Sequence, residues 1–168
     1  EFSILGLATE AKSFVIVIDM SGSMLSYTDL MVDSVLEMLE PLDDSNEFAI
    51  IGYQGTPAPT LWSFPDHSGL ARGTADQLQA ARNFVLSLAR RFAGSTPTHY
   101  ALLGALQYPA EAIILLSDGI DVESILDMSD VEWKAGRSQS LLYWIHPSSV
   151  IEAPGGFYSH WRDVKTSR

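Results

Sequence analysis

The sequence predicts an α/β fold with a mostly parallel sheet, helices on both faces and one short antiparallel edge strand. Two observations predict it. Uninterrupted apolar runs, such as residues 14–18, are typical of strands buried on both faces, as in parallel sheets. These runs alternate along the chain with segments whose apolar residues recur at helical spacing. Such alternation produces right-handed crossovers and a sheet that helices cover on both sides.

The expected strands differ in strength. The loosely alternating residues 1–8 predict an edge strand, and the run Ser13–Asp19 predicts the strongest strand of the chain. A short edge strand is expected after the turn-forming residues 54–59. Besides the two near the N-terminus, the predicted strands are 47–53, Thr60–Phe64, Ala112–Leu116, Leu141–Ile145 and 157–158.

Three helices are expected between these strands. The first covers residues 31–40, where apolar residues recur at helical spacing until a proline follows. The second opens at Thr74, which begins a capping box, and runs to about residue 91. The third covers residues 98–107 and stops before a proline. Short helical turns are predicted at 122–128 and 129–135. Together these elements predict a doubly wound, Rossmann-like sheet.

Composition limits the classes of function. The chain has 168 residues, of which 46% are hydrophobic, so we expect one folded domain over residues 1–168. Its formal net charge of −11 argues against nucleic acid or an anionic membrane as the partner and suits attraction of cations. The absence of cysteine excludes disulfides and thiolate metal sites. No stretch has the length of a membrane span, so direct membrane insertion is not expected.

The native compartment and the oligomeric state do not follow from the composition. No targeting segment is visible. The chain begins at Glu1 without a methionine, so we expect an excised or processed piece of a larger or exported protein.

Oxygen-bearing side chains follow two of the predicted strands. Asp19 ends the first buried strand and is followed at alternate positions by Ser21 and Ser23. Asp118 follows another buried strand, and Thr96 lies in a hydroxyl-rich loop that leads into a helix. Ligands bind at the carboxyl ends of strands in open α/β sheets, and hard divalent cations prefer oxygen ligands. If the two acid-bearing strands are neighbours, the sequence predicts an oxygen-only metal site formed by these five residues.

The charge of such a site indicates its chemistry. Two carboxylates formally neutralise a divalent cation, and neutral hydroxyls add no charge. The cation then keeps enough Lewis acidity to accept one more anionic oxygen, for which an Asp or Glu of a partner protein is the obvious donor. A small, hydroxyl-rich octahedral site favours Mg²⁺, with Mn²⁺ next, over Ca²⁺.

Three motifs in this order resemble the metal-ion-dependent adhesion site of von Willebrand factor type A domains. They are VIDMSGSM at 17–24, GSTPT at 94–98 and LSDG at 116–119. The resemblance covers roughly residues 3–145 and is strongest to the stand-alone bacterial members of the family. It implies a non-enzymatic, divalent-cation-dependent module for adhesion or other protein binding.

The resemblance also implies a role for each motif residue. Ser21 and Ser23 would bind the metal directly, whereas Asp19 and Asp118 would act directly or through water. Thr96 would bind directly in a ligand-engaged state and through water otherwise. Thr98, the second threonine of the GSTPT motif, would cap or support the loop, and it is the alternative to Thr96 if the register of the motif differs by two.

Two departures from the family pattern stand out. Ser95 replaces the second glycine of the usual Gly-Gly-Thr. The segment after residue 147 is short for the family and leaves little room for the C-terminal helix that transmits ligand state in some members.

Two alternative functions remain open. The resemblance permits a subunit role in an AAA+ or chelatase-like assembly. A metal-dependent hydrolase is disfavoured, because Asp19 is followed by Ser-Gly-Ser and not by a second acid two residues on. The chain also has neither a Gly-Lys-Ser/Thr phosphate loop nor a Gly-x-Ser-x-Gly elbow. We interpret the acids at 121, 123, 127 and 130 as a solvated face, and the four histidines as surface or structural residues.

Overall fold

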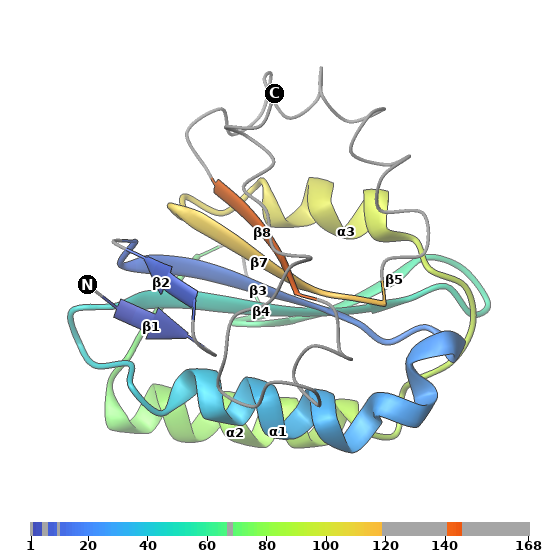
Figure 1. Ribbon diagram of the computed structural model, residues 1–168, viewed down its shortest axis with the longest axis horizontal. Coiled ribbons are helices and arrows are strands. Elements are labelled where there is room, and N and C mark those ends of the chain that lie inside the picture. Colours follow the sequence, from blue (N-terminus) through green and yellow to red (C-terminus); the bar gives the residue numbers. More distant parts are fainter. Residues whose placement is uncertain (1, 5–6, 10, 67–68, 119–140, 146–168) are drawn as a thin grey trace.

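A six-stranded, mostly parallel sheet forms the centre of the structure (Figure 1). In this computed structural model, the described residues are 2–4, 7–9, 11–66, 69–118 and 141–145. The strand order is β5-β4-β3-β7-β8, with β6 also paired to β4. Four strands run parallel: β3 (Ser13–Asp19), β4 (Glu47–Gln54), β7 (Ala112–Leu116) and β8 (Leu141–Ile145). Two run antiparallel to β4: β5 (Thr60–Phe64) and β6 (Ala71–Arg72).

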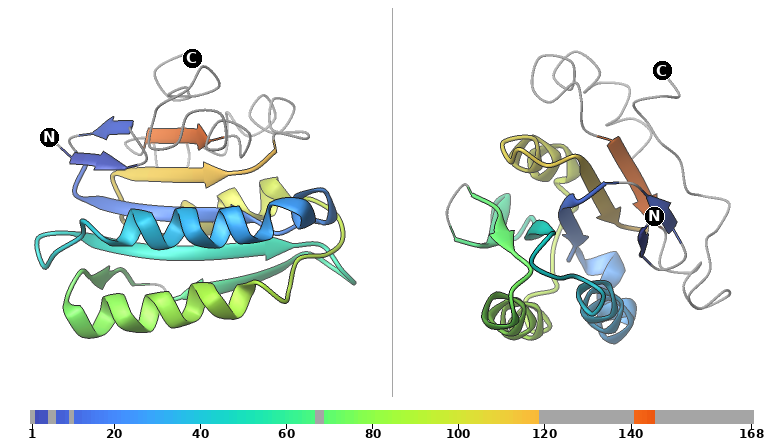
Figure 2. Two further views of the ribbon diagram at one scale, coloured as in Figure 1. Left: turned by 60° about the horizontal axis from the view of Figure 1, so that its bottom comes forward. Right: turned by 90° about the vertical axis from the view of Figure 1, so that its left-hand side faces the viewer.

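Helices lie on both faces of this sheet. On one face α1 (Thr28–Leu39) and α2 (Ala75–Leu88) lie side by side, and α3 (Thr98–Ala105) lies on the opposite face (Figures 1 and 2). A 3₁₀ helix, η1 (Gly22–Tyr27), connects β3 to α1. The predicted α/β fold with a mostly parallel sheet and a short antiparallel edge strand is therefore confirmed, and β6 adds a second antiparallel strand.

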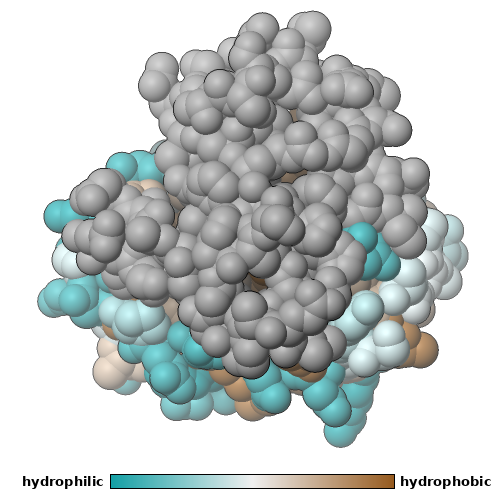
Figure 3. All heavy atoms as spheres, in the orientation of Figure 1, coloured by the Kyte–Doolittle hydropathy of each residue, from teal (hydrophilic) through white to brown (hydrophobic). Residues whose placement is uncertain are grey.

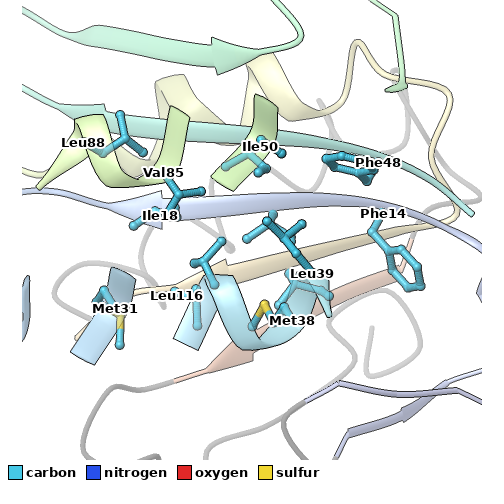
Figure 4. Packing of buried hydrophobic residues seen from close by; sticks show 14 of the residues in the cluster. Phe14, Ile18, Met31, Met38, Leu39, Phe48, Ile50, Val85, Leu88 and Leu116 are labelled. Carbon is cyan, nitrogen blue, oxygen red and sulfur yellow. The ribbon is translucent and has the colours of Figure 1, made fainter. Parts of the chain in front are cut away.

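Two hydrophobic cores explain why the middle residues of the central strands are apolar. All seven residues of β3 are buried. Ile16 and Ile18 pack into the core beneath α1 and α2, part of which is shown in Figure 4. Val15 and Val17 point the other way, into the core beneath α3. A strand buried on both faces needs a continuous apolar run, and residues 14–18 of β3 form one.

Most element boundaries agree with the sequence prediction. The strands β3, β5, β7 and β8 have the predicted bounds, and the helices differ from them by a few residues. Thr74 caps α2 as expected, and its hydroxyl accepts a hydrogen bond of 3.5 Å from the amide of Gln77. The predicted turns at 122–128 and 129–135 and the strand at 157–158 lie outside the described residues, as does the segment after 147. The finer doubly wound, Rossmann-like arrangement stays a prediction.

The N-terminal segment is the one clear correction. We expected a single edge strand over residues 1–8. The structure instead has two three-residue strands, β1 (Phe2–Ile4) and β2 (Leu7–Thr9), that pair antiparallel with each other in a separate sheet. Pairing within the segment satisfies backbone hydrogen-bonding groups locally, so these strands need no place at the edge of the main sheet.

Few large apolar side chains of the described residues are exposed. Figure 3 shows mainly hydrophilic residues near α1 and α2, with hydrophobic ones between them. Among the described residues, the large hydrophobic side chains that are exposed are Leu25, Leu86 and Tyr100. Single exposed side chains of this kind are ordinary for a folded domain. None of the described helices is long and apolar enough to cross a membrane.

Candidate functional site

Three buried polar side chains form a row across the carboxyl ends of β4, β3 and β7. Asp19 is paired in register with Tyr53, and Ser117 follows Leu116, the residue paired with Ile18. Asp19, Tyr53 and Ser117 are all fully buried. Alternation along each strand places them on the face that α3 covers. Because β3 and β7 are neighbours, the two predicted acids lie at the same end of the sheet, as the sequence argument required.

The carboxylate of Asp19 accepts a hydrogen bond on each oxygen. The hydroxyl of Ser117 donates to Oδ2 at 2.6 Å, and the backbone amide of Ser21 donates to Oδ1 at 2.9 Å. Burial raises the pKa of Asp19 above its usual value of 3.8, and the nearby charge of Asp118 raises it further. The hydrogen bonds from Ser117 and Ser21 oppose this shift without cancelling it. The site therefore holds a carboxylate whose negative charge is only partly stabilised.

The two serines of the first motif lie beside this carboxylate. Ser21 is fully buried and extended, and η1 begins at the next residue. Its hydroxyl lies 3.2 Å from that of Ser23, which is exposed, and either can be the donor. Ser21 thus joins the buried Asp19 to a hydroxyl at the surface.

The loop that carries Thr96 lies against the first motif. The amide of Gly22 donates to the carbonyl of Gly94 at 2.8 Å, and the amide of Ala93 donates to the carbonyl of Met20, also at 2.8 Å. The left panel of Figure 2 shows η1 and the segment between α2 and α3 together at one end of the sheet. Two backbone bonds therefore fix this loop beside the Asp19 segment.

Glycine is required at position 94 of this loop. Gly94 has a φ of +82°, and a Cβ there would overlap the side chain of Thr56. The departure at Ser95 is compatible with the fold, because its hydroxyl donates to the carbonyl of Gly55 at 3.4 Å. A side chain on Gly55 would in turn overlap Ser95.

The remaining two predicted ligands are held less directly. Thr96 is half-buried, and its carbonyl accepts a hydrogen bond of 2.9 Å from the amide of Thr98. Asp118 is half-buried just after β7, and its charge acts on Asp19. Hydrogen bonds thus join Ser21 and Ser23 to Asp19, and the charge of Asp118 acts on the same carboxylate. Thr96 is linked to the Asp19 segment only through the backbone of its loop.

Sequence reasoning missed two residues of this site, Ser117 and Tyr53. Ser117 stands in the LSDG motif and alternates with the buried Leu115, so its inward direction could have been read from strand periodicity. Tyr53 ends the predicted strand 47–53, but its place beside Asp19 depends on strand register, which no local pattern carries.

The donor set fits a hard divalent cation. It consists of carboxylates and hydroxyls, which suit Mg²⁺ or Mn²⁺. Within the described residues no three or more His, Cys, Asp or Glu side chains gather where they could hold a metal. The candidate site therefore differs from a carboxylate-rich or histidine-rich centre, because three of its five candidate ligand residues are hydroxyl residues. Its buried carboxylate and the neighbouring Asp118 make added positive charge favourable there.

Comparison with known proteins gives a likeness of fold. No family model matches the chain, and no curated protein matches it. Among solved structures, it is similar to the pilus adhesin SpaC from Lactobacillus rhamnosus GG in its open conformation, with a TM-score of 0.50 and 23% sequence identity. The match covers 68% of this chain and 15% of that adhesin. At this identity the likeness supports the α/β fold and carries no ligand or partner with it.

Proposed function

We propose that this chain is a von Willebrand factor type A domain that binds a protein partner through a divalent cation and has no enzymatic role. The observation that carries the proposal is the buried carboxylate of Asp19. It is hydrogen-bonded to Ser117 and Ser21, and Asp118 lies near enough to raise its pKa. Two acids at the end of a buried sheet are unfavourable unless a positive charge joins them.

The motif residues would share the binding of the metal. Ser21, Ser23 and Thr96 supply hydroxyl oxygens, and Asp19 and Asp118 supply negative charge directly or through water. A bound Mg²⁺ or Mn²⁺ would offer a coordination position for one more anionic oxygen, which the proposal assigns to an Asp or Glu of the partner. The two carboxylates only neutralise the divalent cation, and the hydroxyls add no charge. The bound cation would therefore still accept a third carboxylate from outside.

The similar solved structure agrees with this proposal at a coarse level. SpaC is a pilus adhesin, and a role in adhesion or protein interaction suits a domain with this fold. The likeness is one of fold, so the partner of that adhesin is not transferred to this chain.

Thermal unfolding tests whether the chain binds a cation. The purified chain is stripped with EDTA and then given excess Mg²⁺ or Mn²⁺. At about 100 times the dissociation constant, binding adds about 2.7 kcal/mol, which raises the melting temperature by roughly 5–10 °C in a domain of this size. The Ser21→Ala variant should lose this rise, whereas Ser26→Ala, an exposed serine of η1, should keep it. No rise in the unmutated chain contradicts the proposal.

A peptide array tests the acidic partner. Each peptide carries Asp, Glu, Asn or Gln at one central position in otherwise identical surroundings. We expect binding of the Asp and Glu peptides in Mg²⁺, and its loss in EDTA or in Ser21→Ala. Equal binding of acid and amide peptides, or binding that persists in EDTA, contradicts the assigned role of the carboxylate.

A further inference from the structure

We propose that Tyr53 is a positioning residue of the candidate site. Its buried hydroxyl ties the first turn of α3, and with it the loop that carries Thr96, to the row of side chains that holds Asp19. This inference rests on the proposed function, because the position of Thr96 matters only if its hydroxyl takes part in binding a cation.

Tyr53 forms hydrogen bonds with the segment that follows Asp19 and with the start of α3. Its carbonyl accepts a hydrogen bond of 2.8 Å from the amide of Met20, the residue that follows Asp19. Its hydroxyl lies 2.8 Å from the hydroxyl of Thr98, the first residue of α3. The amide of Thr98 in turn donates to the carbonyl of Thr96. A continuous path of hydrogen bonds, through the side chains of Tyr53 and Thr98, therefore joins the first motif to the second.

Tyr53 and Thr98 are both fully buried, which makes their hydrogen bond informative. Packing alone would accept phenylalanine and valine at these positions, and a buried hydroxyl is costly unless it is hydrogen-bonded. Burial raises the pKa of Tyr53 well above its usual value, and the charge of Asp19 adds to this effect. The phenol is therefore neutral at any working pH and keeps its hydrogen-bonding proton.

The start of α3 depends on such a contact. The helix has eight residues, and its N-cap position is Pro97, which makes no side-chain capping hydrogen bond. Short helices are stabilised mainly by tertiary contacts, and this one begins without the side-chain cap that commonly satisfies first-turn amides. The bond from Tyr53 to Thr98 therefore anchors the end of α3 nearest to Thr96.

The test compares Tyr53→Phe with Tyr108→Phe, which removes a phenol hydroxyl from another buried tyrosine of the same core. Hydrogen exchange of the Thr98 and Ala101 amides is measured by NMR in EDTA, and Mn²⁺ affinity is measured by EPR. Loss of the buried hydrogen bond to Thr98 should speed exchange at these amides about threefold to tenfold in Tyr53→Phe and weaken Mn²⁺ binding by a similar factor. Tyr108→Phe should change neither quantity.

The outcomes separate this inference from the proposed function. Unchanged exchange in Tyr53→Phe overturns the anchoring role, and faster exchange with unchanged Mn²⁺ affinity overturns the link to the site. If the unmutated chain binds no Mn²⁺, the proposed function fails, and exchange alone then decides whether Tyr53 anchors α3. If Tyr53→Phe does not fold, Thr98→Val replaces it, with Thr98→Ser as the variant that keeps the hydroxyl and should behave like the unmutated chain.

Discussion

The hydroxyl of Ser117 donates a 2.6 Å hydrogen bond to the buried carboxylate of Asp19, although 98 positions separate the two residues in the chain. This bond joins the carboxyl ends of β3 and β7 within the candidate site. The hydrogen bond favours the ionised carboxylate, whereas burial and the charge of Asp118 favour the protonated form. Burial and Asp118 have the larger effect, so the pKa of Asp19 is raised. The metal-free domain therefore holds an acid that is less stable when charged than it would be in water.

Asp19→Asn should make the metal-free domain at least as stable as the unmutated chain at neutral pH. The folded-state pKa of Asp19 lies above 3.8, its value in the unfolded chain, so the folded state retains this proton to higher pH. The free energy of unfolding therefore falls as pH rises through that window and stays lower above it. Asparagine is never charged and removes this loss. Urea unfolding in EDTA between pH 4 and pH 8 measures the effect.

The same variant should respond to metal in the opposite way. Asparagine carries no charge to neutralise a cation, so the rise in melting temperature with Mg²⁺ or Mn²⁺ should be lost. A metal-free Asp19→Asn domain that is clearly less stable than the unmutated chain at pH 7 would show that the charged carboxylate stabilises the fold. That result would remove the electrostatic argument for a cation.

Ser117→Ala should destabilise the metal-free domain in a pH-dependent way. Leaving a buried, charged acceptor without its donor costs about 1–3 kcal/mol. It also raises the pKa of Asp19 further, so the cost should be largest at neutral pH and shrink as the pH falls and the carboxyl becomes protonated. Ser34→Ala is the matched control, because its buried hydroxyl donates to the carbonyl of Leu30 at 2.7 Å. Its cost should not vary with pH, and an equal pH profile for both variants contradicts the prediction.

Gly94 and Gly22 share one backbone hydrogen bond and should differ sharply on replacement by alanine. At Gly94 an added Cβ meets a positive φ and overlaps Thr56, so Gly94→Ala should cost about 2 kcal/mol or more. At Gly22 the nearest atom to an added Cβ is the carbonyl oxygen of Gly94, at an ordinary 3.4 Å. Gly22→Ala should therefore cost less than about 1 kcal/mol. Urea unfolding in EDTA compares the two, and similar costs would contradict the described path of the 94–98 loop.

The sequence predicted the strands of the sheet well because their signal is local. Strands buried on both faces contain continuous apolar runs, so β3 and β7 could be located from those runs alone. The acid at the end of each strand followed from the same pattern. What periodicity does not carry is strand order and register, which arise from contacts between distant segments.

Tyr53 and the N-terminal segment show this limit. Tyr53 lies beside Asp19 because β4 pairs with β3 in one particular register. A tyrosine at the end of a predicted strand does not indicate which residue of the next strand it will contact. The weak alternation of residues 1–8 signalled extended backbone, and the structure forms β1 and β2 there. Their pairing with each other, and not with the main sheet, had no signal in that alternation.

The candidate site should prefer Mg²⁺ and Mn²⁺ to Ca²⁺. Mg²⁺ takes six oxygen ligands in a small octahedral shell and keeps several waters, whereas Ca²⁺ takes six to eight ligands and favours bidentate carboxylates. The site offers two carboxylates, one of which already accepts hydrogen bonds on both oxygens, together with hydroxyls. Calorimetric titration of the EDTA-stripped chain with each cation measures the order of affinity. Asp118→Asn should weaken binding of all three cations, because it removes half of the formal negative charge. Tighter binding of Ca²⁺ than of Mg²⁺ would mean that more oxygen ligands surround the ion than these five residues supply.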